Sequence, residues 1–242
     1  MTTVGLILVG NELLTGKIRD ENGYHLAKFC FNHGAVLSFI IVVPDLPDRI
    51  ATAVNQARTE VDIVITSGGV GPTHDDITYE SIAQAFGVKT APAQELVSKI
   101  KSYFGSRTTD AHLKMGHIPS NATLTFPKAG HWPTVSVDNV FIFPGVPHIF
   151  NAKLESIAGL FKGTRSHLVN LRIKGDEGTI ADLLAETEQK FDIAIGSYPI
   201  FDEPNFNVLV TVEGPIQKVV ERAKNQLIDQ LAHIVEMVSE QE

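Results

Sequence analysis

Cysteine is almost missing from this chain, and so are the sequence motifs of common hydrolases. The 242 residues contain a single cysteine, Cys30, which excludes an intramolecular disulfide and a cysteine-rich metal site. A lone thiol is typical of a protein from a reducing compartment, and we expect a cytoplasmic location. No Gly-x-Ser-x-Gly elbow and no paired-histidine zinc motif is present, which argues against a serine or zinc hydrolase.

Basic clusters and long apolar runs are missing as well. The formal net charge is −8, and no block of Lys and Arg of the kind that binds a phosphate backbone occurs, so we expect no nucleic-acid partner. The apolar run at residues 4–9 is too short to span a membrane and lacks the basic residues that precede a signal-peptide core. We therefore expect no membrane partner and a buried strand at residues 4–9.

Apolar runs of strand length alternate with amphipathic stretches of helix length over the first two thirds of the chain. Hydrophobic residues make up 43% and charged residues 20%, as in an ordinary soluble globular protein. The alternation is typical of a parallel sheet with crossover helices, so we predict an α/β fold. Its strands are predicted at residues 4–9, 36–43 and 61–66, and its helices at residues 20–32, 47–58, 77–86 and 93–104.

The pattern changes at the polar stretch of residues 161–166. Before it we predict a short strand, a two-stranded hairpin that turns at Asp138 and Asn139, and a helix that a proline turn opens. After it the order is strand, helix, strand, strand, helix, a compact βαββα unit whose last helix is predicted at residues 216–238. The sequence thus predicts a main domain at residues 1–163 and a small α/β domain at residues 164–242.

A loop rich in glycine and aspartate, TSGGVGPTHDDIT at residues 66–78, follows an apolar strand. In open α/β sheets, ligands bind at the carboxyl edge of the strands. The glycines let backbone amides approach an anion closely and adopt positive φ, and the N-terminus of the following helix adds a partial positive charge. We predict a phosphate or pyrophosphate site formed by Thr66, Ser67, Gly68, Gly69, Gly71, Pro72, Thr73 and Thr78.

Two adjacent carboxylates stand in the same loop. Asp75 and Asp76 would repel a pyrophosphate in a low-dielectric cleft unless a cation lies between them. Magnesium binds through one or two carboxylates together with phosphate oxygens, so we predict that both residues hold a divalent metal and act in catalysis. The alternative for one of the two is that it caps the helix that begins near Ile77.

Two further loops bring polar groups or glycine to the same edge. GNELLTGKIRDEN at residues 10–22 follows the first strand, and a PGVP turn occupies residues 144–147. Asp20 could instead cap its helix, Glu12 could be a solvated loop residue, and the prolines could serve only to fix a turn. The ligand-binding candidates that these loops add are Gly10, Asn11, Glu12, Asp20, Asn22, Pro144 and Gly145.

These motifs together resemble the molybdopterin-binding-domain superfamily. The resemblance rests on GNELLTG at residues 10–16, Asp20, Asn22, TSGGVGPTHDDIT and the PGVP turn. Within the superfamily, the chain is similar to the first domain of the competence/damage-inducible protein A (CinA) family and to the related domain of eukaryotic FAD synthases. VSVDNVFIFPGVP at residues 135–147 and GSYP at residues 196–199 resemble the FAD-synthase version, so the similarity extends over the whole chain.

The resemblance implies a three-layer α/β/α main domain, a small accessory domain and a homo-oligomer such as a dimer or trimer. It also implies metal-dependent hydrolysis of a nucleotide diphosphate such as FAD or ADP-ribose, with magnesium, cobalt or manganese as cofactor and potassium as a further candidate ion. On the matching positions, the glycines would hold phosphate and the aspartate pair the metal, while Asp20 and Asn22 would contact the ligand.

Two departures from the family pattern leave other functions open. Residue 11 is Asn where many relatives carry Asp, and the Gly-Thr-Ala-Pro-Gly stretch of the bacterial family is not recognisable at residues 128–134. One alternative is a protein that binds or adenylylates molybdopterin in molybdenum cofactor biosynthesis. The other is a ligand-binding module without turnover. All three functions predict a nucleotide-like or pterin-like partner that carries phosphate.

Overall fold

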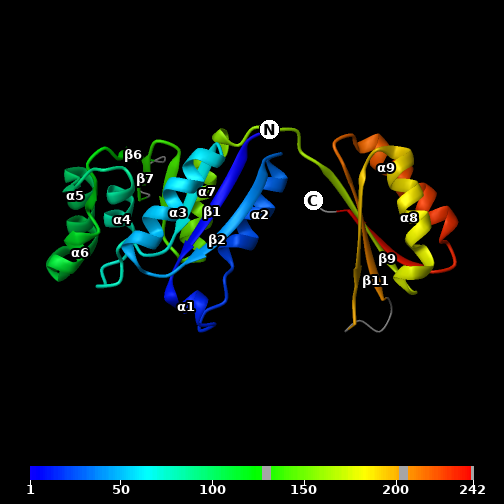
Figure 1. The fold of residues 1–242 in the computed structure, drawn as a ribbon, viewed down its shortest axis with the longest axis horizontal. Coiled ribbons are helices and arrows are strands. Elements are labelled where there is room, and N and C mark those ends of the chain that lie inside the picture. The colour runs from blue at the N-terminus through cyan, green and yellow to red at the C-terminus, as the bar shows by residue number, and fades with distance from the viewer. Residues whose placement is uncertain (127–131, 202–206, 241–242) are drawn as a thin grey trace. The chain divides into compact units, whose positions relative to one another are not determined.

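The computed structural model describes residues 1–126, 132–201 and 207–240. The stretch at residues 128–134, in which the family's Gly-Thr-Ala-Pro-Gly motif is not recognisable, lies mostly outside these ranges. The chain divides into two compact units, Met1–Gly163 and Thr164–Glu242 (Figure 1). No helix among the described residues has the length and apolar character needed to cross a membrane.

The first unit is built on a six-stranded sheet in the order β2-β1-β3-β8-β7-β6. The pairs β1–β2, β1–β3 and β3–β8 are parallel, and the pairs β7–β8 and β6–β7 are antiparallel. The carboxyl ends of the parallel strands therefore meet at one edge of the sheet. The strands are β1 (Thr3–Val9), β2 (Val36–Val43), β3 (Ile63–Ser67), β6 (Thr123–Thr125), β7 (Thr134–Val137) and β8 (Val140–Phe143).

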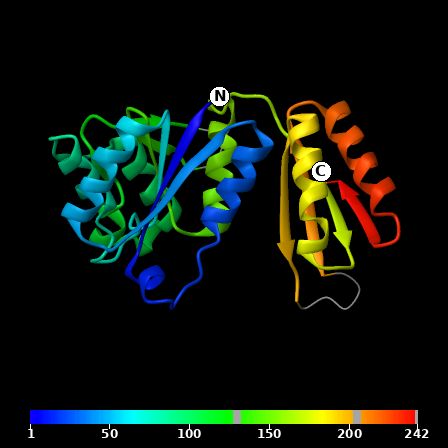
Figure 2. The same ribbon diagram turned by 45° about the vertical axis from the view of Figure 1, so that its right-hand side comes forward.

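Helices cover both faces of this sheet. Alternate residues of β1 pack on opposite sides, Leu6 and Leu8 against α2 and α7, and Ile7 and Val9 against the core that includes α3, α4 and α5. This explains why β1 is apolar throughout, as is usual for a strand inside a mostly parallel sheet. Figure 2 shows α2 beside α7 on one face. The helices are α2 (Asn22–Asn32), α3 (Pro47–Glu60), α4 (Thr78–Ala85), α5 (Gln94–Phe104) and α7 (Pro147–Ile157).

The predicted three-layer α/β/α fold with a mostly parallel sheet is thus confirmed. The predicted hairpin is also present, since β7 and β8 are joined at Asp138, whose φ is 49°. Several elements of three to five residues carry too few positions for a periodic pattern and were not predicted from the sequence. They are α1 (Asn11–Leu14), β4 (Thr90–Pro92), η1 (Gly105–Arg107), α6 (Asp110–Lys114), β5 (His117–Pro119) and η2 (Ala158–Leu160).

The second unit is a four-stranded antiparallel sheet in the order β10-β11-β9-β12, with two helices packed on one face (Figure 1). The buried face alternates with a partly exposed one along β9 and β11, as expected for an antiparallel sheet covered on one side. The elements are β9 (His167–Ile173), α8 (Glu177–Phe191), β10 (Ala194–Pro199), β11 (Val208–Gly214), α9 (Gln217–Gln230) and β12 (Val235–Glu240).

The prediction of one long helix at residues 216–238 is wrong. The helix α9 ends at Gln230, a turn follows in which the amide of Ile234 donates to the carbonyl of Leu231 at 2.8 Å, and β12 then pairs with β9. The valines at 235 and 238 favour a strand. One edge of β9 is hydrogen-bonded to β11, and β12 supplies hydrogen-bond partners to its other edge. A tertiary contact therefore decides the conformation of this segment.

Candidate functional site

The glycine loop leaves β3 at its carboxyl end and turns against the end of β1. Gly68 and Gly69 have φ values of 107° and 65°. A Cβ atom on Gly68 would lie 2.3 Å from the carbonyl oxygen of Val9, and one on Gly69 would lie 2.3 Å from Oγ1 of Thr78. Both the backbone conformation and the available space therefore require glycine. Thr78 fixes the loop, because its hydroxyl donates to Gly68 O and its amide to Gly69 O, each at 2.9 Å.

The aspartate turn is organised around one threonine. The hydroxyl of Thr73 lies 2.6 Å from Oδ1 of Asp75 and also contacts Oδ2 of Asp76, which accepts from the Thr73 amide at 2.7 Å. A hydroxyl has one proton and cannot donate to both carboxylates at once. The hydrogen bond from Thr73 holds the pKa of Asp75 below its usual range. On the other side of the turn, Lys114 Nζ donates to the Asp76 carbonyl at 2.7 Å.

Helix capping does not explain these carboxylates. The helix α4 begins after Ile77 and has no side-chain cap, so the alternative that Asp75 or Asp76 caps it is wrong. The turn instead holds two carboxylate groups next to the glycine loop.

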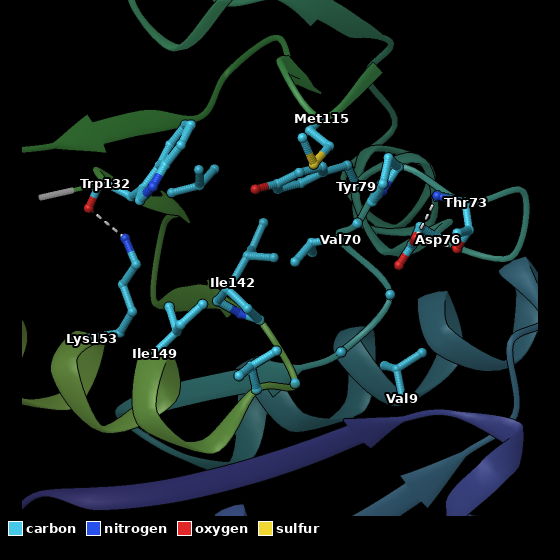
Figure 3. Close-up of a pocket in the computed structure, with 18 of the residues that line it drawn as sticks. Val9, Val70, Thr73, Asp76, Tyr79, Met115, Trp132, Ile142, Ile149 and Lys153 are labelled. Carbon is cyan, nitrogen blue, oxygen red and sulfur yellow. Dashed lines mark hydrogen bonds between the residues drawn. The ribbon is translucent and has the colours of Figure 1, made fainter. Parts of the chain in front are cut away.

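A pocket of about 740 Å³ opens at this edge of the sheet. Figure 3 shows its two ends, with Thr73 and Asp76 at one and Trp132 and Lys153 at the other. Three further acidic residues, Asp75, Glu12 and Asp45, belong to the lining. The largely apolar part of the lining is called here the apolar chamber, and it consists of Tyr79, Leu96, Ile100, Tyr103, Phe104, Met115, Trp132, Pro133, Val135, Ile142, Ile149 and Lys153.

Ten of the sequence-predicted site residues line this pocket. They come from all three predicted loops, which the fold brings to one edge. The ten are Glu12, Gly68, Gly69, Gly71, Pro72, Thr73, Asp75, Asp76, Pro144 and Gly145.

The other predicted residues do not line the pocket, but several of them hold the loops in place. Asn22 is 4% exposed, and its Nδ2 donates to Ser67 Oγ at 2.9 Å and to Gly145 O at 2.8 Å. Both carboxylate oxygens of Asp20 accept hydrogen bonds from backbone amides in the first turn of α2, each at 3.0 Å. Asp20 therefore caps this helix, as the alternative to ligand binding predicted. The predicted residues outside the lining are Gly10, Asn11, Asp20, Asn22, Thr66, Ser67 and Thr78.

Lys153 is a pocket residue that was not predicted from the sequence. It lies on the buried face of α7 beside Leu154 and is 7% exposed. Its Nζ donates to the carbonyl of Trp132 at 2.6 Å and to that of Pro133. Burial, together with repulsion from Lys99, lowers the pKa of Lys153 to about 8. The available signal was a lysine at an apolar position of an amphipathic helix.

Asp45 and Tyr79 were missed as well. Asp45 follows the carboxyl end of β2, so it reaches the same edge as the glycine loop, and its Oδ2 accepts the amide of Asn11 at 2.8 Å. Tyr79 stands in the first turn of α4, and burial raises the pKa of its phenol, which is therefore a neutral hydrogen-bonding group. A polar residue just after a strand end was the signal for Asp45.

The carboxylates suit a metal that is shared with a ligand. Among the described residues, no three His, Cys, Asp or Glu side chains are grouped closely enough to hold a metal ion by themselves. Asp75 and Asp76 nevertheless direct carboxylate oxygens to one point, the Thr73 hydroxyl. Two such oxygens plus the oxygens of a bound phosphate are a donor set that magnesium accepts.

The fold and the pocket define an α/β protein whose ligand site lies at the carboxyl edge of a mostly parallel sheet. Residues 5–162 match the family model of the probable molybdopterin binding domain, and the chain belongs to this family. Residues 165–238 match the middle domain of FAD synthase.

Individual relatives agree with these matches. A protein of Archaeoglobus fulgidus is 33% identical over 222 residues, which are 91% of this chain and 94% of the relative. The crystal structure of the protein CinA with unknown function from Thermoplasma acidophilum is 32% identical, has a TM-score of 0.60, and covers 66% of this chain and 98% of its own. A probable FAD synthase of Caenorhabditis elegans is 28% identical across 96% of this chain, which spans 51% of that protein. The resemblance to CinA proteins and FAD synthases is confirmed.

Proposed function

We propose that this chain is a metal-dependent pyrophosphatase that acts on a nucleotide diphosphate of the FAD or ADP-ribose type. The observation that carries the proposal is the joining of two elements in one pocket. The glycine loop offers backbone amides to a diphosphate, and the carboxylates of Asp75 and Asp76 lie beside it on the Thr73 hydroxyl. An apolar chamber continues from this polar end, as expected for a ligand with a charged part and a ring.

The charge at the polar end supports a cation in the reaction. Four carboxylates, from Glu12, Asp45, Asp75 and Asp76, line the pocket, and a diphosphate would meet strong repulsion there without a cation. Asp75 and Asp76 would hold a divalent metal such as magnesium, cobalt or manganese. When bound, such a metal polarises the phosphoryl group and lowers the pKa of a coordinated water.

The protein's own groups would orient the reactants. The glycine loop begins at the end of β3, where the Gly68 amide donates to the carbonyl of Phe143 at 3.1 Å, and Thr73 contacts both carboxylates. Lys114 holds the carbonyl of Asp76 and adds positive charge near the turn. Because the turn is fixed by hydrogen bonds before a ligand arrives, little reorganisation is needed when the diphosphate binds.

The second candidate is a molybdopterin-binding or adenylylating protein, which the family match of the first unit favours. A pterin phosphate would use the same glycine loop and chamber. The match of the second unit to the middle domain of FAD synthase favours a flavin nucleotide instead. The homo-oligomer that the family implies stays a prediction.

The proposal is tested by incubating the full chain with FAD, ADP-ribose, NAD or ATP and separating the products by chromatography. Each substrate is tested with magnesium, cobalt or manganese, with and without potassium. We expect AMP to be released from FAD or ADP-ribose, and the D75N/D76N variant to lose at least about 100-fold in rate, because such a loss corresponds to removing a metal site.

Asp62→Asn is the matched control. Asp62 precedes β3 at the end opposite the glycine loop, and like Asp76 it accepts both the amide and the hydroxyl of one threonine, Thr3, at 2.8 and 2.9 Å. Its variant should retain the wild-type rate. Absence of turnover with every substrate in a folded protein would overturn the pyrophosphatase proposal and leave binding of a pterin or nucleotide.

A further inference from the structure

The apolar chamber has an aromatic wall that the proposed hydrolysis does not use. The rings of Tyr103 and Trp132 meet at 5.6 Å between centroids with an angle of 68°, and Tyr103 meets Phe104 at 4.9 Å and 84°. Edge-to-face pairs of this kind fix one another in position. With Tyr79 they form four aromatic side chains in the pocket lining. Figure 3 shows Tyr79 and Trp132 on one side of the pocket and the aliphatic residues Ile142 and Ile149 on the other. A chamber of this composition fits a flat ring.

One charged group belongs to this chamber. Lys153 is the basic side chain among the described residues that line the pocket, and it points from α7 toward the carbonyl of Trp132 (Figure 3). Two backbone carbonyls accept from its ammonium group, which has three N–H donors and no acceptor. Among the described residues these two carbonyls are its acceptors, which leaves one donor for a ligand, and they fix the position of the nitrogen.

We infer that the chamber binds a planar nitrogen heterocycle that carries a ring carbonyl, and that Lys153 donates to this carbonyl. The inference rests on the proposed function, because the ring belongs to the nucleotide whose diphosphate lies on the glycine loop. An ammonium group can only donate, so it selects an acceptor edge and disfavours an amino group at the same place. Lys153 thereby determines specificity for flavin-like, pterin-like or 6-oxopurine rings over adenine, and of the two proposed substrates it favours FAD over ADP-ribose.

The chain carries its own reporter for this test. Trp132 is the single tryptophan, so tryptophan fluorescence of the full protein reports on the chamber. The probes are IMP and AMP, whose rings differ in a carbonyl or an amino group at position 6, together with FMN and ribose 5-phosphate. From the fluorescence titrations we expect dissociation constants for IMP and FMN that are at least tenfold lower than the dissociation constant for AMP. Ribose 5-phosphate, which carries no nitrogen heterocycle, should leave the signal unchanged.

Lys153→Met tests the residue itself, since methionine keeps the length and apolar stem but has no donor. We expect IMP to bind about tenfold more weakly to this variant, while AMP binding changes less than twofold. Lys89→Met, at an exposed lysine that does not line the pocket, should behave as the wild type. If Lys153→Met does not fold, the IMP-to-AMP ratio of the wild type and of Lys153→Arg still decides the matter, because arginine keeps the donors.

The inference and the proposed function can fail separately. Equal binding of IMP and AMP to the wild type, or an unchanged preference in Lys153→Met, overturns the inference whether or not a substrate is hydrolysed. A ring preference that depends on Lys153 in a protein that hydrolyses nothing overturns the pyrophosphatase proposal and leaves the inference in place. The D75N/D76N variant should lose hydrolysis and retain the ring preference.

Discussion

The side-chain amide of Asn22 donates to the carbonyl oxygen of Gly145 at 2.8 Å, across 123 positions of sequence. The same nitrogen donates to Ser67 Oγ at 2.9 Å. Asn22 thereby joins the loop after β1, the end of β3 and the turn before α7, which together form the polar end of the pocket. Because Asn22 is 4% exposed, water cannot readily replace these hydrogen bonds if the side chain is removed.

Asn22→Ala should therefore destabilise the first unit. Leaving Ser67 and Gly145 without their buried donor is expected to lower the free energy of unfolding by about 2 kcal/mol. Asn225→Ala, at an exposed position of α9, is the control and should change it by less than about 0.5 kcal/mol. Urea denaturation followed by circular dichroism measures both. Equal stabilities of the two variants would contradict a structural role for Asn22.

Two glycines with nearly equal φ angles allow backbone strain and steric clash to be measured separately. Gly69 and Gly87 have φ values of 65° and 66°. A Cβ atom on Gly87 would meet nothing within 4 Å, whereas one on Gly69 would lie 2.3 Å from Thr78 Oγ1. Gly87→Ala should cost about 1 kcal/mol from the left-handed conformation alone, and Gly69→Ala a further amount of about 1–3 kcal/mol from overpacking.

Unfolding in urea gives both values for the glycine pair. Gly69→Ala should also lose hydrolysis in the FAD and ADP-ribose assay, because the clash moves the glycine loop, while Gly87→Ala should retain it. Similar effects of the two substitutions on stability and turnover would show that the loop tolerates a side chain at residue 69.

Thr73 should control the acidic side of the pH profile for hydrolysis. Its hydroxyl hydrogen bond lowers the pKa of Asp75, so the carboxylate form persists to lower pH in the wild type. Thr73→Val keeps the shape and removes the hydroxyl, so the pKa of Asp75 should rise toward its usual range and the acidic limb of the rate profile should move to higher pH. The rate at neutral pH should fall about 10- to 100-fold, because the Asp75 carboxylate loses the hydrogen bond that fixes its direction.

Thr73→Ser is the control for this experiment, because serine keeps the hydroxyl and should retain both the rate and the position of the acidic limb. The measurement is the rate of hydrolysis of FAD or ADP-ribose between about pH 2 and 8, an interval that includes the usual pKa range of an aspartate and the values below it. A Thr73→Val profile that coincides with the wild-type profile would contradict the role given to the hydroxyl.

The sequence predicted those parts of the fold whose conformation depends on local pattern. The apolar run of β1, the glycine and proline turns and the helical spacing of Leu96, Ile100 and Phe104 on α5 each follow from nearest neighbours in the chain. The strand β12 could not be predicted in this way. It forms because β9 offers a free edge, and that edge lies more than 60 residues earlier in the sequence.

The part of the candidate site that could be predicted consists of motifs that directly follow the carboxyl ends of strands. Gly68, Asp75 and Gly145 line the pocket because parallel strands end at one edge. The chamber was not predictable, since its residues come from α4, α5, α7 and the strands between them, and nothing in the order of the sequence shows that these segments enclose a space. Lys153 faces the pocket only because α7 packs against the sheet on its apolar side.

Lys153 should also make the stability of the protein depend on pH. Its pKa is lowered from an ordinary 10.5 to about 8 by burial and by repulsion from Lys99, and the side chain is 7% exposed. Between pH 8 and 10.5 the unfolded chain therefore binds more protons than the folded protein, and stability rises with pH. Below pH 8 the lysine is charged in both states, and its contribution is constant and unfavourable by about 3 kcal/mol.

Other lysines and tyrosines also titrate at high pH, so the measurement is a comparison of the wild type with Lys153→Met in urea at pH 7.5 and 9.5. The wild type should gain about 2 kcal/mol relative to the variant over this interval, as the shift of the pKa requires. The variant also leaves the carbonyls of Trp132 and Pro133 without the donor that Lys153 supplies. The cost of these lost hydrogen bonds opposes the gain from removing a buried charge at pH 7.5. The difference between the two pH values does not depend on that loss, because it is the same at both. A constant difference between the two proteins would show that the folded protein binds and releases the Lys153 proton as the unfolded chain does.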